Sequence, residues 1–242
     1  MSAFLEVKDL AISFGGVKAL QGIHFTMGKG EILGLIGPNG SGKSTAVNII
    51  SGVYKQDRGE ILFDGQNIPQ KMPIHERAKV GMARTFQTPK PFGHYTVWEN
   101  IYSIALLKHS HKEAAEKTRD VLKMTKLEPY TKMLSAKLPI EKRKWLDLAR
   151  ILATSPKLIM LDEVMAGLNT SEMGESLDLV RTINKEGISI MFIEHVMKAV
   201  VDICPRVVVL NEGKILAEGE CREVLGRKEV IEAYIGEEIK NA

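Results

Sequence analysis

Residues 37–45 read Gly-Pro-Asn-Gly-Ser-Gly-Lys-Ser-Thr, and they lie between the apolar run 32–36 and a helical pattern. Glycines at a strand-to-helix turn let backbone N–H groups point inward, which suits the turn to phosphate. In this G-x-x-x-x-G-K-[ST] pattern, Lys43 is placed to reach the outer phosphates of a nucleotide and Ser44 to hold Mg²⁺. A glycine-rich turn with an incidental lysine is the simpler alternative, but the flanking strand and helix favour nucleotide binding. The predicted nucleotide contacts in the loop are Asn39, Gly40, Ser41, Gly42, Lys43, Ser44 and Thr45.

The composition indicates a globular chain. Its 242 residues are 44% hydrophobic and 26% charged, enough for one large domain or two lobes that share a core. No apolar run approaches the roughly 20 residues that span a bilayer, and the start lacks the features of a signal peptide, so we expect a cytosolic protein. The net charge of +3 does not call for a nucleic acid partner. Cys204 and Cys221 lack metal-binding spacing and are interpreted as reduced, structural thiols.

The order of expected elements predicts an α/β fold. Alternating residues in 4–14 indicate antiparallel strands, whereas the apolar runs 157–161, 189–193 and 206–210 alternate with helices and indicate a mostly parallel sheet. Residues 97–153 are almost wholly helical in pattern. We therefore expect one domain over residues 1–242, with a phosphate-loop core and an N-terminal antiparallel β region (1–87 and 154–242) and an inserted helical subdomain (88–153).

A second group of polar residues follows two other apolar runs. Asp162 and Glu163 come directly after the run 158–161, at the end of a strand where ligands bind in α/β sheets. Asp162 can hold Mg²⁺ through its water shell, and Glu163 can polarise a water for attack on the γ-phosphate. His195 ends another apolar run and can contact the γ-phosphate. Each is an ordinary strand end when taken alone, and together with the phosphate loop they predict a hydrolase.

The motifs resemble those of a known family. The phosphate loop is followed by Arg84-Thr-Phe-Gln87, Leu158–Glu163, Ala166–Asn169 and Ile193–His195, in the order seen in ATP-binding cassette ATPases, so the resemblance covers nearly the whole chain. The stretches 81–87, 162–169 and 194–197 look more narrowly like the ATPase subunits of branched-chain amino acid importers. The resemblance implies a P-loop NTPase core, with ATP and Mg²⁺ as ligands.

The resemblance also implies roles for single residues. Phe14 would stack on adenine, although a lone aromatic residue in a strand is more often part of a core. Gln87 would touch the metal and the attacking water while sensing the membrane subunit. Asn169 would lie in a loop that contacts the opposite subunit. In this family two cassettes close head to tail around two ATP molecules, and hydrolysis reopens the pair.

The chain departs from the family pattern in the segment 138–144, Leu-Pro-Ile-Glu-Lys-Arg-Lys, where a glycine-rich turn would bind the partner's γ-phosphate. Glu141 replaces a glycine there, which adds like-charge repulsion and a Cβ atom, and Lys142, Arg143 and Lys144 can offset only part of it. Because this segment serves the opposite site, we expect a heterodimer with a second cassette whose segment is intact.

The resemblance further implies integral membrane permease subunits and an external solute-binding protein as partners. The chain would then lie in the cytoplasm, peripheral on the inner face of the cell membrane. We expect docking in the helical region, with Phe92, Tyr95, Val97 and Trp98 either exposed for it or packed in the core. Two rival hypotheses stay open: a soluble cassette ATPase outside transport, and a regulatory subunit with weak turnover. The transported solute is not encoded in any motif, and an amino acid or related polar solute is only what the family suggests.

Overall fold

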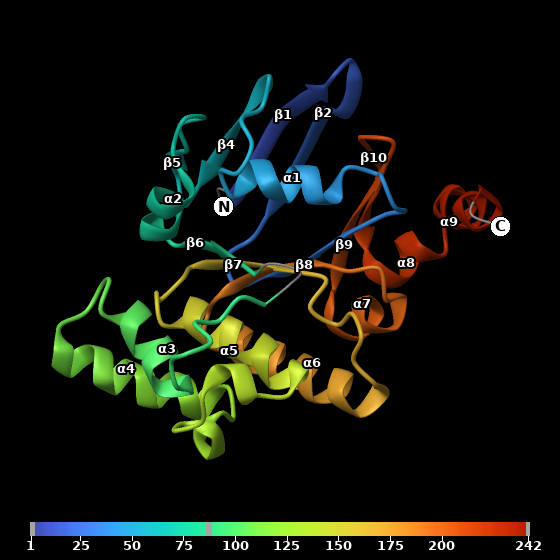
Figure 1. The fold of residues 1–242 in the computed structure, drawn as a ribbon. Helices are drawn as coiled ribbons and strands as arrows, with labels where there is room; N and C mark the ends of the chain where they lie inside the picture. The colour runs from blue at the N-terminus through green and yellow to red at the C-terminus, as the bar shows by residue number, and fades with distance from the viewer. Residues whose placement is uncertain (1–2, 86–88, 241–242) are drawn as a thin grey trace. The chain divides into compact units, whose positions relative to one another are not determined.

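The chain divides into two units, of which unit 1 contains residues 1–77 and 189–242 and unit 2 contains residues 78–188. Figure 1 shows the elements of the computed structural model, which describes residues 3–85 and 89–240, with side chains up to residue 235. The predicted boundaries of the helical subdomain, 88–153, stay a prediction.

Unit 1 begins with an antiparallel sheet in the order β2-β1-β4-β5. The alternating residues 4–14 form one strand, since the chain passes Asp9 in the left-handed region (φ 47°) and shifts register without leaving the sheet. Buried Leu5, Val7 and Leu10 fill the inner face, as the alternating pattern predicts. The strands are β1 (Leu5–Phe14), β2 (Val17–Met27), β4 (Arg58–Phe63) and β5 (Gln66–Asn67).

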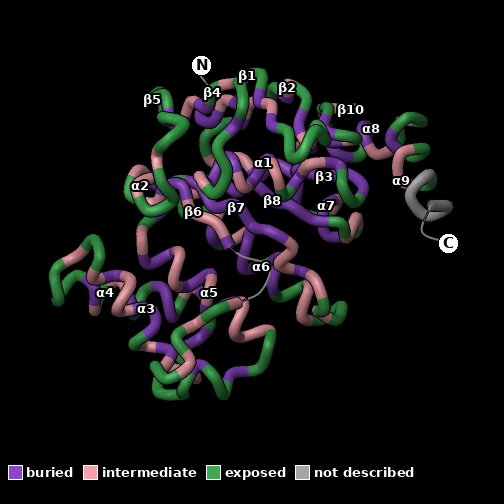
Figure 2. Tube along the Cα trace, turned by 45° about the horizontal axis from the view of Figure 1, so that its top comes forward, coloured by how far each residue is buried: buried purple, intermediate pink, exposed green. Residues whose placement is uncertain are grey.

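The second set of strands in unit 1 carries the phosphate loop. Strand β3 (Ile32–Ile36) pairs in parallel with β8 (Ser189–Ile193) and with β9 (Arg206–Asn211), and β10 (Lys214–Glu220) pairs antiparallel with β9. Every residue of β3 and β8 is buried, and Figure 2 shows β8 as a buried stretch. Continuous apolar runs therefore mark the parallel strands here, as expected for a sheet covered on both faces. The helices of this unit are α1 (Lys43–Ile50), α7 (Met197–Ile203), α8 (Cys221–Leu225) and α9 (Lys228–Lys240).

Helix α2 (Ile74–Val80) starts in unit 1 and ends in unit 2. Its Arg77 side chain is buried, and one guanidinium nitrogen donates to the carbonyl oxygens of Ile49 (2.6 Å) and Ile50 (2.8 Å) at the end of α1. A cation at a helix C-terminus complements the helix dipole and occupies otherwise unsatisfied carbonyls. Arg77 therefore closes the helix that follows the phosphate loop.

Unit 2 contains the parallel strand pair β6 and β7 and most of the helices. Three helices begin with capping boxes. The side chains of Thr96, Ser110 and Asn169 accept hydrogen bonds from backbone N–H groups of the first turn, and a glutamate three residues further on accepts one from the backbone N–H of the cap residue. The helical pattern predicted for 97–153 is thereby confirmed, interrupted only by loops and two 3-10 turns. The elements are β6 (Met82–Arg84), α3 (Val97–Ala105), α4 (His111–Met124), η1 (Glu128–Tyr130), η2 (Ser135–Lys137), α5 (Ile140–Leu152), β7 (Leu158–Asp162) and α6 (Thr170–Lys185).

Candidate functional site

The loop between β3 and α1 has the backbone conformation that its glycines predict. Gly37, Gly40 and Gly42 have φ values of 146°, 71° and 106°, in a region that residues with a side chain rarely adopt. A Cβ atom on Gly37 would lie 2.0 Å from the carbonyl oxygen of Leu210, and one on Gly42 would lie 2.8 Å from the carbonyl oxygen of Ala19. The loop therefore requires glycine at both positions, both for conformation and for space.

Lys43 is buried against this loop. Its ammonium donates to the carbonyl oxygens of Gly37 (2.7 Å) and Pro38 (2.8 Å), so the charge is held over the loop backbone. The cap position of α1 is Gly42, which has no side chain to accept a hydrogen bond from the first N–H groups of the helix. These N–H groups and the lysine fit a polyphosphate, which needs close backbone approach and a cation.

The other predicted loop contacts lie around the same turn. Asn39, Gly40 and Ser44 are exposed, Thr45 is half-buried at the start of α1, and Ser41 is buried with its carbonyl oxygen accepting from the N–H of Gly213 at 3.0 Å.

Two further predicted site residues belong to unit 1. Phe14 is at the end of β1 and is 44% exposed, so it is not a core residue. His195 is exposed directly after β8, where it follows the fully buried Glu194.

The two cysteines also lie in unit 1, and both are buried and free of disulfides. Burial, together with Cys221 and Glu194 nearby, raises the pKa of the Cys204 thiol, and burial raises that of Cys221. Both thiols therefore stay protonated, which agrees with a structural role.

The predicted carboxylates lie in unit 2 at the end of β7. The carboxylate of Asp162 accepts from the guanidinium of Arg84 on β6 (3.0 Å), and its backbone N–H donates to the hydroxyl of Thr85 (3.0 Å). Burial lowers the pKa of Arg84, while the charge of Asp162 acts in the opposite direction. The ion pair and the Thr85 hydrogen bond therefore fix the orientation of Asp162. The sequence motif 84–87 contains Arg84 but indicates no function for it, because only the pairing of the distant strands β6 and β7 brings Arg84 and Asp162 together.

Glu163 follows with φ of 50°, in the left-handed region that costs a residue with a side chain free energy. Its side chain is half-buried. Such strain is typical of functional sites, where the surrounding structure fixes an unfavourable conformation. The ammonium of Lys144, on α5, donates to the carbonyl oxygens of Val164 and Ala166 and so fastens the loop that carries Glu163.

Asn169 ends this loop as the cap residue of α6. Its side-chain oxygen accepts from the N–H groups of Ser171 (2.9 Å) and Glu172 (3.0 Å). Gln87, the remaining predicted site residue, lies outside the described residues.

The segment 138–144 turns its charged side chains back onto unit 2. The carboxylate of Glu141 pairs with Lys142 at 3.1 Å, and the Lys142 ammonium lies 3.5 Å from the centre of the Trp145 ring. The guanidinium of Arg143 donates to the carbonyl oxygens of Leu138 (2.9 Å) and Ala136 (2.6 Å). The negative charge of Glu141 is thus balanced locally, while its side chain still lies where the family pattern has glycine.

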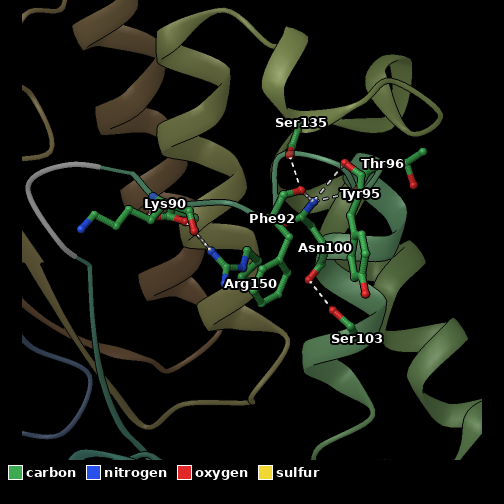
Figure 3. A network of polar contacts seen from close by, with 9 residues as sticks. Lys90, Phe92, Tyr95, Thr96, Asn100, Ser103, Ser135 and Arg150 are labelled. Carbon is green, nitrogen blue, oxygen red and sulfur yellow. Dashed lines mark hydrogen bonds and ion pairs between the residues drawn. The ribbon is translucent and has the colours of Figure 1, made fainter.

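An exposed aromatic pair precedes α3 in unit 2. Phe92 and Tyr95 are 45% and 48% exposed, with ring centres 5.6 Å apart. The buried side chain of Asn100 donates to three carbonyl oxygens, those of Phe92, Tyr95 and Thr96, and accepts from the N–H of Phe92 at 2.8 Å (Figure 3). The guanidinium of Arg150 lies 4.6 Å from the centre of the Phe92 ring and donates to the carbonyl oxygen of Lys90. These contacts fix the backbone that carries Phe92 and Tyr95, while both rings stay exposed to solvent.

The other two predicted docking residues differ from this pair. Val97 is fully buried and belongs to the core, whereas Trp98 is half-buried, stacked on Tyr102 with Arg119 near its ring.

Among the described residues, no helix is long and apolar enough to cross a membrane. In the same part of the chain, no group of three or more His, Cys, Asp or Glu residues could hold a metal ion by itself. The His111 ring and the Tyr102 hydroxyl share a hydrogen bond of 2.9 Å.

The phosphate loop on a buried parallel strand and the carboxylates at the end of another define the class of P-loop ATPases. Residues 20–166, more than half of the chain, match the ABC transporter family model. This chain belongs to that family, and its α/β fold and ATPase class are thereby confirmed.

Individual relatives are similar over almost their whole length. The high-affinity branched-chain amino acid transport ATP-binding protein BraF of Pseudomonas aeruginosa is 32% identical over 96% of this chain and 98% of its own. The lipopolysaccharide export system ATP-binding protein LptB of Haemophilus influenzae is 29% identical, with coverages of 98% and 99%. The crystal structure of an ATP-binding cassette of an ABC transporter in its ADP conformation is 31% identical with a TM-score of 0.87, covering 98% of this chain and all of that one.

Proposed function

We propose that this chain is the ATP-hydrolysing subunit of a membrane importer for a small polar solute, with branched-chain or related amino acids as the expected class. The similarity to BraF over 96% of the chain carries this proposal. The similarity to an export ATPase is lower, at 29% identity.

The proposed chemistry assigns one role to each residue group. The loop N–H groups and Lys43 bind the triphosphate, Phe14 stacks on adenine, and Ser44 and Asp162 hold Mg²⁺, with Gln87 as a further contact. When bound there, Mg²⁺ would supply positive charge that offsets the charge developing on the phosphates. Glu163 accepts the proton of the attacking water, and His195 contacts the γ-phosphate. The close glycine backbone of the loop and the oriented carboxylate of Asp162 fit these ligands.

We further propose that the partner in the closed dimer is a different cassette. Glu141 and Lys142 neutralise each other, which removes most of the charge repulsion expected from Glu141 alone. Their side chains still occupy the helix start that a γ-phosphate must approach closely. A homodimer would place this obstruction in both sites, whereas a partner with an intact segment leaves one site competent.

Steady-state phosphate release with Mg²⁺ and ATP tests catalysis and the heterodimer together. We expect the purified wild type to be nearly inactive, Glu141→Gly to gain activity, and Glu163→Gln in that background to lose about 100-fold or more while MgATP still binds. Vigorous, cooperative hydrolysis by the wild type would rule out the heterodimer. Turnover unaffected by Glu163→Gln would contradict the assigned base, and no turnover under any condition would favour the regulatory alternative.

For the membrane partner, we propose that the exposed pair Phe92 and Tyr95 receives a permease subunit on the inner face of the cell membrane, with an external solute-binding protein in the full system. Aromatic residues on rigid supports are typical of interface anchors. Replacing both with alanine should weaken binding to vesicles that contain the co-expressed permease subunits. The control Leu107→Ala, at an apolar position elsewhere in unit 2 that is even more exposed (74%), should not. Equal loss in both variants would argue against this docking surface.

A further inference from the structure

A second aromatic residue, Tyr54, lies against Phe14. The ring centres are 5.3 Å apart and the ring planes are inclined by 66°, an edge-to-face arrangement. Both rings are partly open to solvent, since Phe14 is 44% and Tyr54 38% exposed. An edge-to-face contact covers at most one face of Phe14, so a face is left for a planar ligand.

Tyr54 is held in place from two sides. The backbone N–H groups of Val53 and Tyr54 both donate to the carbonyl oxygen of Asn48 in α1, at 2.7 and 3.1 Å. Three residues on, the N–H of Asp57 donates to the carbonyl oxygen of Ala11 (2.8 Å), and its carboxylate accepts from the N–H of Ser13 (2.8 Å). The loop 53–57 therefore joins α1 to the end of β1, next to Phe14.

The hairpin formed by β1 and β2, which contains Phe14, is also fixed to the phosphate loop. Phe14 pairs with Val17 at the end of the β1–β2 hairpin, and Leu20, a few residues along β2, packs against Gly42. The N–H of Gln21 donates to the carbonyl oxygen of Gly213, and the N–H of Gly213 donates to that of Ser41. Phe14 and the phosphate loop thus share one hydrogen-bonded framework within unit 1, which fixes where a base can lie relative to its phosphates.

From this geometry we propose that Tyr54 is a positioning residue for the adenine base. Its ring packs against Phe14 and holds the Phe14 ring in the orientation that stacks on the purine. The inference rests on the proposed role of Phe14. Without the contact with Tyr54, Phe14 has more rotamers to lose on binding, and the base is held less firmly while the phosphates are unaffected.

The test compares a ligand that has the base with one that lacks it. Calorimetric titration with MgATP and with magnesium tripolyphosphate would be applied to wild type, Tyr54→Leu, Tyr54→Phe, Phe14→Ala and the double variant Phe14→Ala/Tyr54→Leu. We expect Tyr54→Leu to weaken MgATP about threefold to tenfold and tripolyphosphate less than twofold, the range of an aromatic pair. Tyr54→Phe should retain wild-type affinity. In the Phe14→Ala background, Tyr54→Leu should have no further effect.

Three results would overturn the proposal. A parallel loss for both ligands would indicate a general structural role, which Tyr54→Phe and the unfolding midpoint of each variant would reveal. An unchanged MgATP affinity in Tyr54→Leu would exclude any role at the base. An undiminished effect in the Phe14→Ala background would mean that Tyr54 contacts the base itself. The proposed function fails separately, if wild type binds no MgATP or if Phe14→Ala leaves both affinities unchanged.

Discussion

Two helix starts in this molecule differ in what they present to a ligand, although both follow a loop that the family uses for phosphate. At the start of α1 the chain has glycines in the left-handed region and backbone N–H groups without a side-chain cap. At the start of α5, Pro139 is the cap residue, and Glu141 and Lys142 pair over Trp145. The first start exposes backbone to a ligand, whereas the second covers it with side chains. A helix dipole alone therefore does not make a phosphate site; the residues in front of it decide.

The largest expected effect comes from placing an alanine before or at each of the two helix starts. Gly37→Ala should lower the free energy of unfolding by at least about 2 kcal/mol, because the Cβ would clash with the carbonyl of Leu210 and strain the backbone. Glu141→Ala should cost less than about 1 kcal/mol, since it loses only a local ion pair. Urea unfolding followed by circular dichroism measures both. Similar losses at the two positions would mean that the two starts are packed alike.

A second contrast concerns the two lysines. Lys43→Met should reduce MgATP affinity about 10- to 100-fold, because a charged hydrogen-bond donor is lost at the phosphates. Lys142→Met should change the affinity of the isolated chain less than about threefold, because its ammonium is bound to Glu141 and Trp145 in the other unit. Calorimetric titration distinguishes them. A comparable loss in Lys142→Met would show that the second start contributes to the chain's own nucleotide site.

The charge of Glu141 allows a smaller test. Glu141→Gln should raise phosphate release by about twofold to fivefold at low salt, and the gain should shrink as salt screens the interaction. Glu175→Gln is the matched control, since Glu175 also approaches Lys142 (3.7 Å) but is more exposed. An equal gain in both variants would point to general surface charge and away from the start of α5.

The last contrast concerns capping. Thr96→Ala should destabilise α3 by about 1 kcal/mol, while Pro139→Ala at the uncapped α5 should cost less than about half of that. The hydrogen bonds from Thr96 lower the pKa of Glu99 below its ordinary 4.5, so the stabilisation is complete above pH 4.5 and is lost as the pH falls through the lowered pKa. Urea midpoints at pH 7 and at pH 3.5 should thus differ more in wild type than in Thr96→Ala. A pH-independent difference would exclude the carboxylate as the cause.

The start of α1 could be predicted almost completely from sequence, since glycine spacing, the apolar run and Lys43 are all local signals. The start of α5 could be predicted only in part. Glu141 is visible as a departure from the family pattern, but its pairing with Lys142 and the ring of Trp145 depends on helix geometry and neighbouring contacts. A string of three basic residues gives no indication that each turns to a different partner.

The site shows the same division between local and distant signals. Asp162 and Glu163 follow an apolar run and were predicted as a pair, whereas Arg84 had no assigned role because β6 lies far from β7 in sequence. Tyr54 had no local signal at all, since its contact with Phe14 depends on how the loop 53–57 is fastened to β1. Such residues are found only when distant strands and loops are brought together.

The left-handed backbone of Glu163 sets catalytic function against the stability of the fold. Glycine adopts a φ of 50° without steric strain. Glu163→Gly should therefore relax this turn and raise the free energy of unfolding by about 1 kcal/mol. The same change removes the proposed base. Selection for robustness alone would discard this glutamate, and a lineage that retains it gives up some stability for as long as turnover matters.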